Sequence, residues 1–425
     1  MAMAEAEIKQ DVRLDDVITT VVMARVTDYF GFFVFAIASA LVFPTVFFPF
    51  LDPVPGTLAS FAVFSLAFLA RPVASLIGRR LQRRIGRAGK ITVALMLLGS
   101  STVAIGLLPG YDKIGLLAPV LLAVLRIIQG LGLGGSWDGL TLQLKSAAPK
   151  DRAGRYGMVP QLGGPIGFCV AAAMFYVLTG FLTPEEFITH GWRFAFFAVM
   201  AVNVVSLFAR LRLLTTDFGS DDETLMKTSP LRHLIAVEWR SILLSALLPL
   251  SSYALLHMLT VFPISYTLLY TDHAISTIIL WQLVGGTLAI GTVIASGLLA
   301  DRYSSRAVLL VASILTLALC FTIGTLDTMP SVYIILGFLV FGLSYGQSSS
   351  IVPNRFSPET RYSGSALATN LSWIIGAAFA PFVGLFLVST FGLWAAALYL
   401  VSGVIVTLAS LVLLQRSKSI KPPLA

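Results

Sequence analysis

Charged residues are scarce in this sequence of 425 residues. Asp, Glu, Lys and Arg make up only 12% of it, whereas hydrophobic residues make up 57%. Soluble domains carry roughly 25% charged residues and use them to cover the surface that folding leaves exposed. This chain has too few charges to cover a soluble fold of its length, so we expect lipid to be its solvent.

Cysteine and histidine are also rare, and motifs of known catalytic machinery are absent from the sequence. Both cysteines, Cys169 and Cys320, lie inside apolar runs, which argues against a disulfide framework. The four histidines are scattered, and there is no H-E-x-x-H, G-x-S-x-G or Walker sequence. These absences exclude the common routes to hydrolysis, redox chemistry and ATP-driven transport. We therefore predict a protein that is not an enzyme and needs no metal or cofactor.

Long apolar runs make up most of the chain. A helix needs about 20 apolar residues to cross ~30 Å of hydrocarbon. Runs of that length lie near 19–48, 57–78, 91–109, 115–144, 156–181, 191–214, 241–270, 275–299, 307–326, 331–352, 362–389 and 392–414. The sequence predicts an all-α membrane protein of twelve transmembrane helices. Its expected parts are six-helix halves at 19–214 and 241–414, a central loop at 215–240, and tails at 1–18 and 415–425.

The distribution of Lys and Arg predicts the orientation of the chain. Three of the 29 basic residues, Arg25, Arg71 and Arg126, lie well within spans, and two, Lys113 and Arg193, lie in or next to odd-numbered gaps. The others lie in the tails, in even-numbered gaps or at the span ends beside those gaps. By the positive-inside rule, both termini then face the cytoplasm, and the protein is multi-pass in the plasma or inner membrane. The densest basic group, at 78–90, could bind lipid or nucleic acid. Its place after span 2 favours a topogenic role, and we expect no nucleic-acid partner.

The turns after spans 2 and 8 occupy corresponding positions in the two halves. Residues 78–90 read GRRLQRRIGRAGK, and residues 297–306 read GLLADRYSSR. Repeated halves around a central site are typical of transporters. This repetition therefore favours a transporter over a channel or a receptor.

The second turn resembles the loop motif of the major facilitator superfamily, G-x-x-x-D-R-x-G-R/K. The matching residues are Gly297, Asp301, Arg302 and Arg306, with Ser304 in the place of the second glycine. The first turn keeps Gly86 and Arg87 of the motif, but Gln82 or Arg83, depending on register, stands at the acidic position.

Further segments, in order along the chain, resemble the metabolite:proton symporter family of that superfamily. They include ALVFPTVFFP at 40–49, FAVFSLAFLARP at 61–72, RIIQGLGLGG at 126–135, YGMVPQLGGPIG at 156–167 and RYSGSALATNLSWIIGAAFAP at 361–381. The resemblance implies the major facilitator fold and import of carboxylates, shikimate-like or aromatic acids, or zwitterionic osmolytes, with a proton gradient as the energy source.

Two family motifs are altered in this chain. The E-W-Y-D-F run of helix 1 becomes DYFGF, which keeps the first acid as Asp28 and loses the second. The G-G-E-W-G-G run of helix 4 becomes GGSWDG, which moves the acid to Asp138. The usual carboxylates of the family therefore carry over only in part.

Five charged side chains are predicted to lie at membrane depth, all in the first half: Arg25, Asp28, Arg71, Arg126 and Asp138. Such groups cost at least ~2.5 kcal/mol each on insertion scales, so they are expected to pair or to face a cavity. Arg25 and Asp28 share a helix face at i, i+3, and Arg126 has a similar predicted depth to Asp28. We hypothesise that Asp28 couples proton and substrate binding through a neighbouring arginine. The alternative is a permanent pair with Arg126 or Arg25 that only fixes helix packing.

Substrate contacts are predicted from polar and aromatic residues on facing spans. The candidates are Arg25, Arg126, Gln129, Tyr253, Tyr345, Gln347, Asn370 and Trp373. His257, one turn after Tyr253, is a second proton candidate. Hydrogen bonding between helices explains each of these residues without a substrate.

Residues of a gate or cytoplasmic latch are predicted near the ends of the spans. The candidates are Arg71, Arg83, Arg84, Arg87, Asp138, Asp301, Arg302 and Arg306. Asp138 could face Arg83 to Arg87, and Asp301 with Arg302 and Arg306 could form the equivalent latch in the second half. A solvated helix end and a topogenic turn are the alternatives.

Together these features predict a proton-coupled symporter that imports a small organic acid by alternating access, as a monomer in the lipid bilayer. The excess of arginine over carboxylate in the first half favours an anion as substrate. An exporter or proton antiporter of an amphipathic compound is the alternative, and a large apolar cavity without a paired Arg126 would favour it. A non-transporting membrane sensor would instead have a collapsed cavity or an added signalling domain.

Overall fold

The computed structural model describes residues 14–135, 144, 149–215, 229–357 and 359–418, and its elements in these ranges are all helical. In the first half the helices are α1 Leu14–Leu41, α2 Phe43–Phe47, α3 Pro53–Leu107, α4 Tyr111–Ile114, α5 Leu117–Gly135, α7 Ala153–Met158, α8 Gly163–Phe181, α9 Pro184–Glu186 and α10 Arg193–Thr215. In the second half they are α11 Leu231–Leu247, α12 Leu250–Thr260, α13 Phe262–Tyr270, α14 Ile275–Arg302, α15 Ser305–Cys320, α16 Pro330–Ser348, α17 Arg361–Trp373, α18 Ala380–Phe391 and α19 Trp394–Lys418. Short 3-10 or π segments include Val159–Leu162 and Ile374–Ala378.

Helices suit this composition because lipid offers no hydrogen-bond partner to exposed backbone groups. In a helix, the backbone N–H and C=O groups bond to each other. Within the described ranges, ten helices are long and apolar enough to cross a membrane. The bent pair Pro184–Gly191 and Arg193–Phe208, which turns by 45°, raises the number to eleven, and Ser305–Cys320 is a shorter apolar helix. The all-α membrane class is confirmed, whereas the number of twelve helices stays a prediction.

Two helix boundaries differ from those expected. The basic turn after span 2 is helical, because α3 runs from Pro53 to Leu107 and bends at Gly86, whose φ of 77° suits glycine. Helix α11 begins at Leu231, so residues 231–240, which we assigned to the central loop, are helical. Leu234 is buried in α11 and packs in an apolar cluster with Phe356. The charged residues of this segment, such as Arg232 and Arg240, led us to assign it to the loop.

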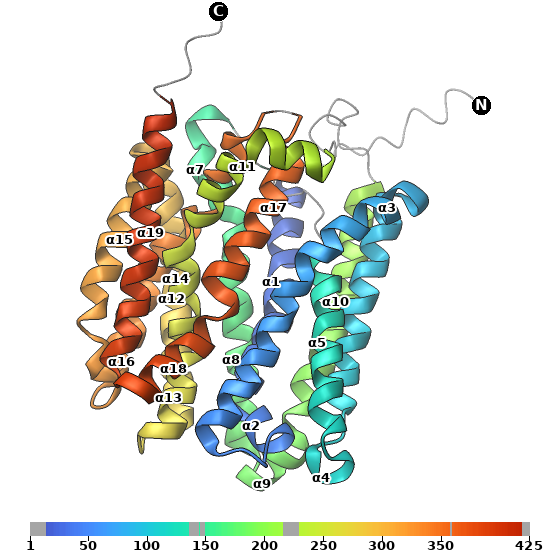
Figure 1. The fold of residues 1–425 in the computed structure, drawn as a ribbon, viewed down its shortest axis with the longest axis vertical. Coiled ribbons are helices and arrows are strands. Elements are labelled where there is room, and N and C mark those ends of the chain that lie inside the picture. Colours follow the sequence, from blue (N-terminus) through green and yellow to red (C-terminus); the bar gives the residue numbers. More distant parts are fainter. Residues whose placement is uncertain (1–13, 136–143, 145–148, 216–228, 358, 419–425) are drawn as a thin grey trace, which may run out of the picture.

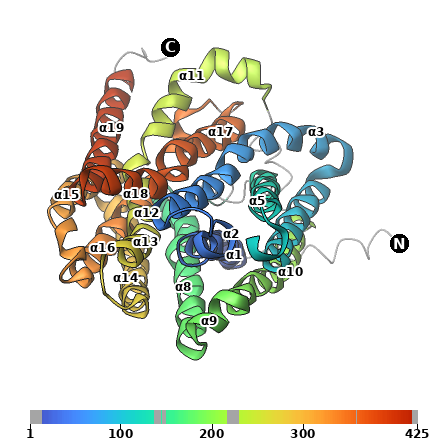
Figure 2. The same ribbon diagram turned by 60° about the horizontal axis from the view of Figure 1, so that its bottom comes forward.

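The helices form two bundles that lie against each other (Figures 1 and 2). Elements α1 to α10, in blue and green, make one bundle, and elements α11 to α19, in yellow to red, make the other. Helices α1, α3 and α8 of the first half face α12, α14 and α18 of the second. The start of α1 and the end of α19 lie at the same end of the bundle (Figure 1).

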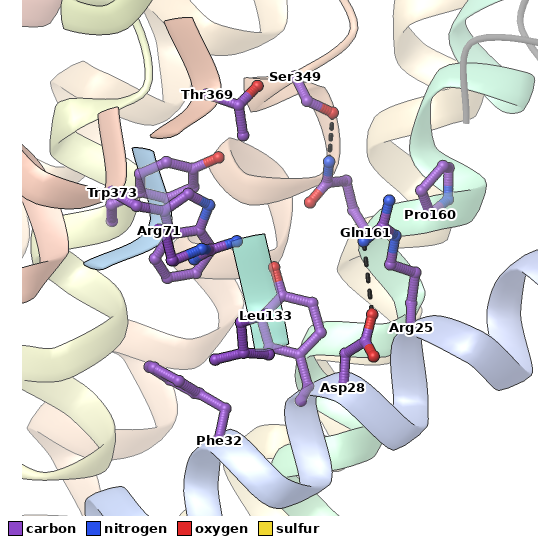
Figure 3. Close-up of a pocket in the computed structure, with 12 residues that line it drawn as sticks. Arg25, Asp28, Phe32, Arg71, Leu133, Pro160, Gln161, Ser349, Thr369 and Trp373 are labelled. Carbon is purple, nitrogen blue, oxygen red and sulfur yellow. Dashed lines mark hydrogen bonds and ion pairs between the residues drawn. The ribbon is translucent and has the colours of Figure 1, made fainter. Parts of the chain in front are cut away.

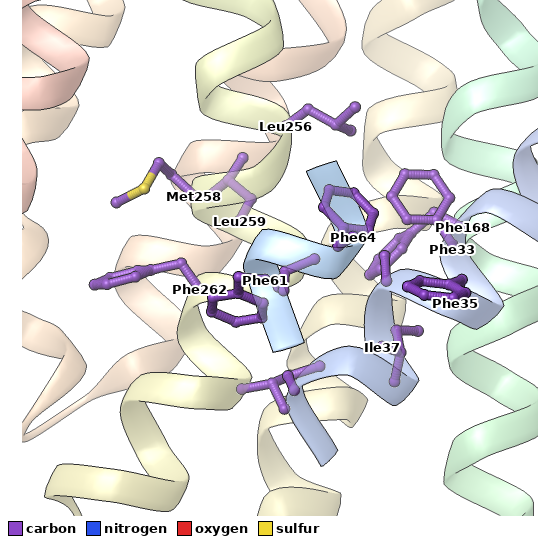
Figure 4. Packing of buried hydrophobic residues seen from close by; sticks show 14 of the residues in the cluster. Phe33, Phe35, Ile37, Phe61, Phe64, Phe168, Leu256, Met258, Leu259 and Phe262 are labelled. Atoms are coloured by element: carbon purple, nitrogen blue, oxygen red, sulfur yellow. The ribbon is translucent and has the colours of Figure 1, made fainter. Parts of the chain in front are cut away.

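A buried aromatic and aliphatic core joins the two halves at the other end of the bundle. Figure 4 shows part of it, with phenylalanines from α1, α3 and α8 facing α12 and α13. Phe33, Phe35, Phe61, Phe64 and Phe262 are all fully buried. Close packing of this kind drives helix association where lipid removes the hydrophobic effect. These rings close the bundle at the end where α2 and α13 lie.

Candidate functional site

A cavity of about 100 Å³ lies between the two halves, next to this aromatic core (Figure 3). The first half contributes Arg25, Asp28, Tyr29, Phe32, Arg71, Leu133, Pro160 and Gln161 to its lining. The second half contributes Tyr253, Ser349, Thr369 and Trp373. A single water molecule needs at least ~10–15 Å³ of such volume, so the cavity has room for several waters. The cavity is therefore small and has charged walls.

An ion pair on α1 forms one wall of the cavity. The Arg25 Nη1 and Asp28 Oδ2 atoms are 3.6 Å apart, and both side chains line the cavity (Figure 3). The i, i+3 spacing along α1 places the two groups on one face, as the sequence predicted. A cation and a carboxylate thus lie beside any molecule that enters.

An aromatic stack forms the opposite wall, and Arg71 lies over it. The Trp373 ring stacks on Tyr253, with centroids 4.4 Å apart and an interplanar angle of 23°. The Arg71 guanidinium carbon is 5.6 Å from the centre of a Trp373 ring, within the range of a cation–π interaction. We predicted a gate role for Arg71, and the structure places it in the cavity lining, within reach of a substrate.

Polar contacts between the halves lie beside the cavity. Gln161 Nε2 donates a hydrogen bond to Ser349 Oγ (Figure 3), and Tyr345 OH donates one to Tyr29 OH. Farther along the interface, Ser65 Oγ donates to the carbonyl of Ala378 at 2.6 Å. Any separation of the halves at these positions must break these bonds.

The ion pair between Asp28 and Arg126 that similar depth suggested is not formed. Arg126 is buried, and its Nε donates to the Phe64 carbonyl at 3.2 Å while Nη1 donates to Gln129 Oε1 at 3.0 Å. Its guanidinium carbon also lies 3.8 Å from the centre of the Phe35 ring. Aromatic rings and the Gln129 amide thus hold Arg126 in place, and a hydropathy pattern does not reveal such contacts. Asp28 pairs with Arg25 instead.

His257 is fully buried among aromatic rings and does not line the cavity. Its ring centroid lies 5.6 Å from that of Phe32 and 5.4 Å from that of Phe64. Neither of its nitrogens has a hydrogen-bond partner among the residues that the structure describes. The ring therefore packs as part of the aromatic layer beside the cavity.

The remaining predicted contacts lie at varied distances from the cavity. Tyr253 and Trp373 line it, and Tyr345 is bonded to a lining tyrosine. Gln347 instead donates to the Gly154 carbonyl at 3.4 Å, in the interface between the halves, and Asn370 is buried outside the lining.

Sequence reasoning missed several residues of the lining. These are Tyr29, Phe32, Leu133, Pro160, Gln161, Ser349 and Thr369. Helical spacing from Arg25 and Asp28 would have found Tyr29 and Phe32, each at i+4. Gln161 lies in the 3-10 segment Val159–Leu162, and an uncharged polar residue there gave no comparable signal.

Comparison with known proteins identifies the family. Residues 29–373 match the model of the Major Facilitator Superfamily. The chain belongs to the Major Facilitator Superfamily. It is 33% identical over 403 residues to the inner membrane metabolite transport protein YhjE of Escherichia coli K12, covering 92% of each chain. It is 27% identical over 413 residues to the shikimate transporter of the same organism, again covering 92% of each.

The fold also resembles a solved member of the superfamily. The xylose transporter XylE from E. coli, in a partially occluded inward-open conformation, matches with a TM-score of 0.69 at 13% identity, over 93% of this chain and 96% of that one. This major facilitator protein is therefore a multi-pass metabolite transporter of the cell inner membrane and not an enzyme.

A carboxylate of this transporter joins its two halves near the end where α1 begins. Asp301, at the end of α14, accepts hydrogen bonds at Oδ1 from the backbone N–H of Gly154 at 2.7 Å and of Arg155 at 3.3 Å. Its Oδ2 accepts from Arg155 Nε at 2.6 Å. Gly154 allows this approach, because a Cβ there would lie 2.7 Å from that of Ala300. We call this contact the α7–α14 latch.

The partners of Asp301 differ from those expected within its own turn. Arg302 lies over the Tyr303 ring, with 5.4 Å from the guanidinium carbon to the centroid. Arg306 Nη2 donates to Gln415 Oε1 at 2.6 Å, inside the second half. The ion-pair partner of Asp301 is Arg155, because the start of α7 packs against the end of α14. The latch role of Asp301, Arg302 and Arg306 stays a prediction.

The corresponding basic turn of the first half bears no acid at that position. Arg83 and Arg84 are exposed and Arg87 is half-buried, on either side of the bend at Gly86. Asp138, their expected partner, lies outside the described residues.

Proposed function

We propose that this transporter is a proton-coupled symporter, driven by a proton gradient, that imports a small organic anion by alternating access as a monomer. One observation carries the proposal. Among the residues that the structure describes, two arginines, Arg25 and Arg71, and one carboxylate, Asp28, line the cavity between the halves. A cavity with this excess of cations favours an anionic ligand, and the stacked rings of Tyr253 and Trp373 add a flat apolar surface.

The Arg25–Asp28 pair supplies a coupling mechanism. An entering carboxylate competes with Asp28 for the Arg25 guanidinium. When the substrate holds Arg25, Asp28 loses its counter-charge and binds a proton, so that substrate and proton favour each other's binding. Release of either one at the other side of the membrane restores the ion pair. Arg25 Nη1 and Asp28 Oδ2 are only 3.6 Å apart, so no other side chain lies between them and must move before a substrate carboxylate replaces Asp28 at Arg25.

Alternating access requires that each end of the bundle can open. The α7–α14 latch and the bond between Gln161 and Ser349 close the end where the chain begins, and the buried phenylalanines close the other. Rocking of the halves around the cavity would break these two closures in turn.

Reconstitution in liposomes with an imposed pH gradient tests the proposal. Labelled carboxylates, aromatic acids and betaines are screened for uptake against a concentration gradient. With a carboxylate that accumulates, Asp28→Asn should abolish uphill uptake and retain substrate exchange. Asp272→Asn, which neutralises an exposed acid outside the cavity, should leave both unchanged. Unchanged uphill uptake by Asp28→Asn would exclude the coupling role.

One observation favours the alternative, an exporter or antiporter of an amphipathic compound. Arg126 pairs with no carboxylate in the described part of the chain. The cavity, however, is small and charged, whereas an amphipathic compound calls for a large apolar one. In the same vesicles an antiporter would accumulate substrate only when the proton gradient is reversed, so one set of measurements separates the two.

A further inference from the structure

A second, much smaller cavity lies behind Asp28, inside the first half. Its volume is about 10 Å³, and we call it the rear cavity. Asp28, Phe32 and Leu133 line both cavities, so they form the partition between them. The far wall of the rear cavity includes Arg126 and Asn203. Asp28 therefore has the substrate cavity on one side and a buried polar space on the other.

Two deeply buried side chains of the rear cavity carry polar atoms without partners. Arg126 is 1% exposed and Asn203 is 3% exposed. Within the described ranges, Arg126 Nη2 and both amide atoms of Asn203 make no hydrogen bond. Buried polar groups are nearly always bonded, to protein or to ordered water, so three such atoms on one cavity call for a ligand.

The other polar atoms near these groups are already bonded. Gln129 Oε1 accepts from Arg126 Nη1, and Gln129 Nε2 donates to Thr102 Oγ1 at 2.8 Å. Thr102 Oγ1 in turn donates to the Leu98 carbonyl at 2.6 Å. Among the residues that the structure describes, rearrangement would satisfy one group only by breaking the bond of another. A ligand from outside the protein would satisfy these atoms without that cost.

Size and charge limit what this ligand can be. A water molecule needs at least ~10–15 Å³ and two to four polar partners, and the rear cavity offers both. A cation would lie against the Arg126 guanidinium, and an anion would lie against Asp28. Water is neutral and both donates and accepts, so it suits a site with a guanidinium, an amide and a carboxylate.

We propose that the rear cavity binds one water molecule, held by Arg126 and Asn203, and that this water connects Arg126 to Asp28. The water accepts a hydrogen bond from Arg126 Nη2. It donates to Asn203 Oδ1 and to the carboxylate of Asp28. The two charged side chains, which form no direct pair, are thereby linked within the first half.

The second part of the inference rests on the proposed proton coupling. If the substrate displaces Asp28 from Arg25, the water from the rear cavity remains as a partner of the carboxylate. Asn203 orients this water and is thus a positioning residue for coupling, although it touches no substrate. It lies on α10, a helix that supplies no residue to the lining of the substrate cavity.

A high-resolution structure of the full chain in lipid nanodiscs tests the water site directly. We expect density at ~2.7–3.2 Å from both Arg126 Nη2 and the Asn203 amide. Asn203→Leu, which keeps the approximate volume and removes both polar atoms, should lose this density. Absence of density in the wild-type protein, or direct contact between Arg126 and Asp28, would overturn the proposal. The test on the wild-type protein remains valid even if the Asn203→Leu variant does not fold.

Transport by matched variants tests the positioning role. Asn203→Leu should lower pH-driven accumulation by roughly fivefold or more, within the usual range of coupling between sites, while exchange stays within about twofold. Ser206→Ala removes a buried hydroxyl one turn along α10 that also lacks a partner in the described structure but does not line the rear cavity. It should behave as the wild type.

The outcomes separate the two proposals. If Asn203→Leu accumulates substrate normally while wild-type density is present, the water exists but Asn203 has no positioning role. If the wild-type protein shows no proton-driven accumulation, the proposed function fails, and the density still decides the water site.

Discussion

Replacement of Asp301 by asparagine would test how strongly the α7–α14 latch holds the two halves together. The carboxylate is 7% exposed and accepts three hydrogen bonds, one of them from the Arg155 guanidinium. A bond to a charged group contributes about 1.5–3 kcal/mol, and a neutral one about 0.5–1.5 kcal/mol. Asparagine can still accept from the N–H of Gly154, and Arg155 is 45% exposed and screened by water. We therefore expect a loss of about 1 kcal/mol, which is roughly a fivefold shift of the equilibrium toward the open latch.

Distance measurement between spin labels can detect this shift. Labels at Arg152 and Tyr303, both exposed, would report on the ends of α7 and α14 in a protein whose native cysteines are replaced. Asp301→Asn should enlarge the long-distance population about fivefold. Arg306→Gln is the matched control, because Arg306 bonds to Gln415 within the second half. Identical distance distributions for Asp301→Asn and the wild type would refute the latch.

Three further predictions follow from the same contacts. In α3, Gln82 stands at one of the two positions that correspond to Asp301, depending on register. The Nε atom of Arg361, which begins α17, is buried without a partner in the described structure. Gln82→Asp should add a second latch when α3 closes on α17 and slow substrate exchange about fivefold, and unchanged exchange would contradict this. Trp373→Ala removes the ring that stacks on Tyr253 and lies under an arginine, so the KM of uptake should rise about tenfold, whereas Trp373→Phe should keep most of the affinity. His257→Phe should leave the pH dependence of uptake unchanged, because the ring is already packed among phenylalanines, and a lost dependence would make it the proton site.

The depth of a side chain in the bundle was predictable from the sequence, but its direction around the helix was predictable only in part. Depth follows from counting residues at 1.5 Å each, and direction between neighbours on one helix follows from the i, i+3 rule. Arg25 and Asp28 were placed correctly by these rules. Arg126 is directed by Phe35 and Gln129, which hold its guanidinium away from Asp28. Such neighbours belong to packing, which the pattern of one chain does not specify.

Partners from the other half were the least predictable part of the site. The motif around Asp301 was evident, but its partner Arg155 lies 146 positions earlier in the chain. Gln161 and Ser349 are separated by 188 positions. Both contacts depend on how the two bundles pack against each other. From the sequence alone, an uncharged polar residue within an apolar run could equally well form a hydrogen bond between helices of one half or line the cavity. Hydropathy therefore predicted the all-helical membrane class and motif resemblance predicted the family, but the sequence predicted only part of the cavity lining.

The two closures of the bundle differ in chemistry, and this difference bears on the order in which they open. At the end where α1 begins, the halves are joined by hydrogen bonds such as those of Asp301 and Gln161. Solvent can bond to the donors and acceptors that are freed, so each broken bond costs only about 0.5–3 kcal/mol net. At the other end, rings such as Phe61 of the first half and Phe262 of the second are fully buried, and separation of the halves there exposes apolar surface without a comparable compensation. The polar closure is thus the easier one to open, so the empty cavity should communicate first with the side on which the chain begins and ends.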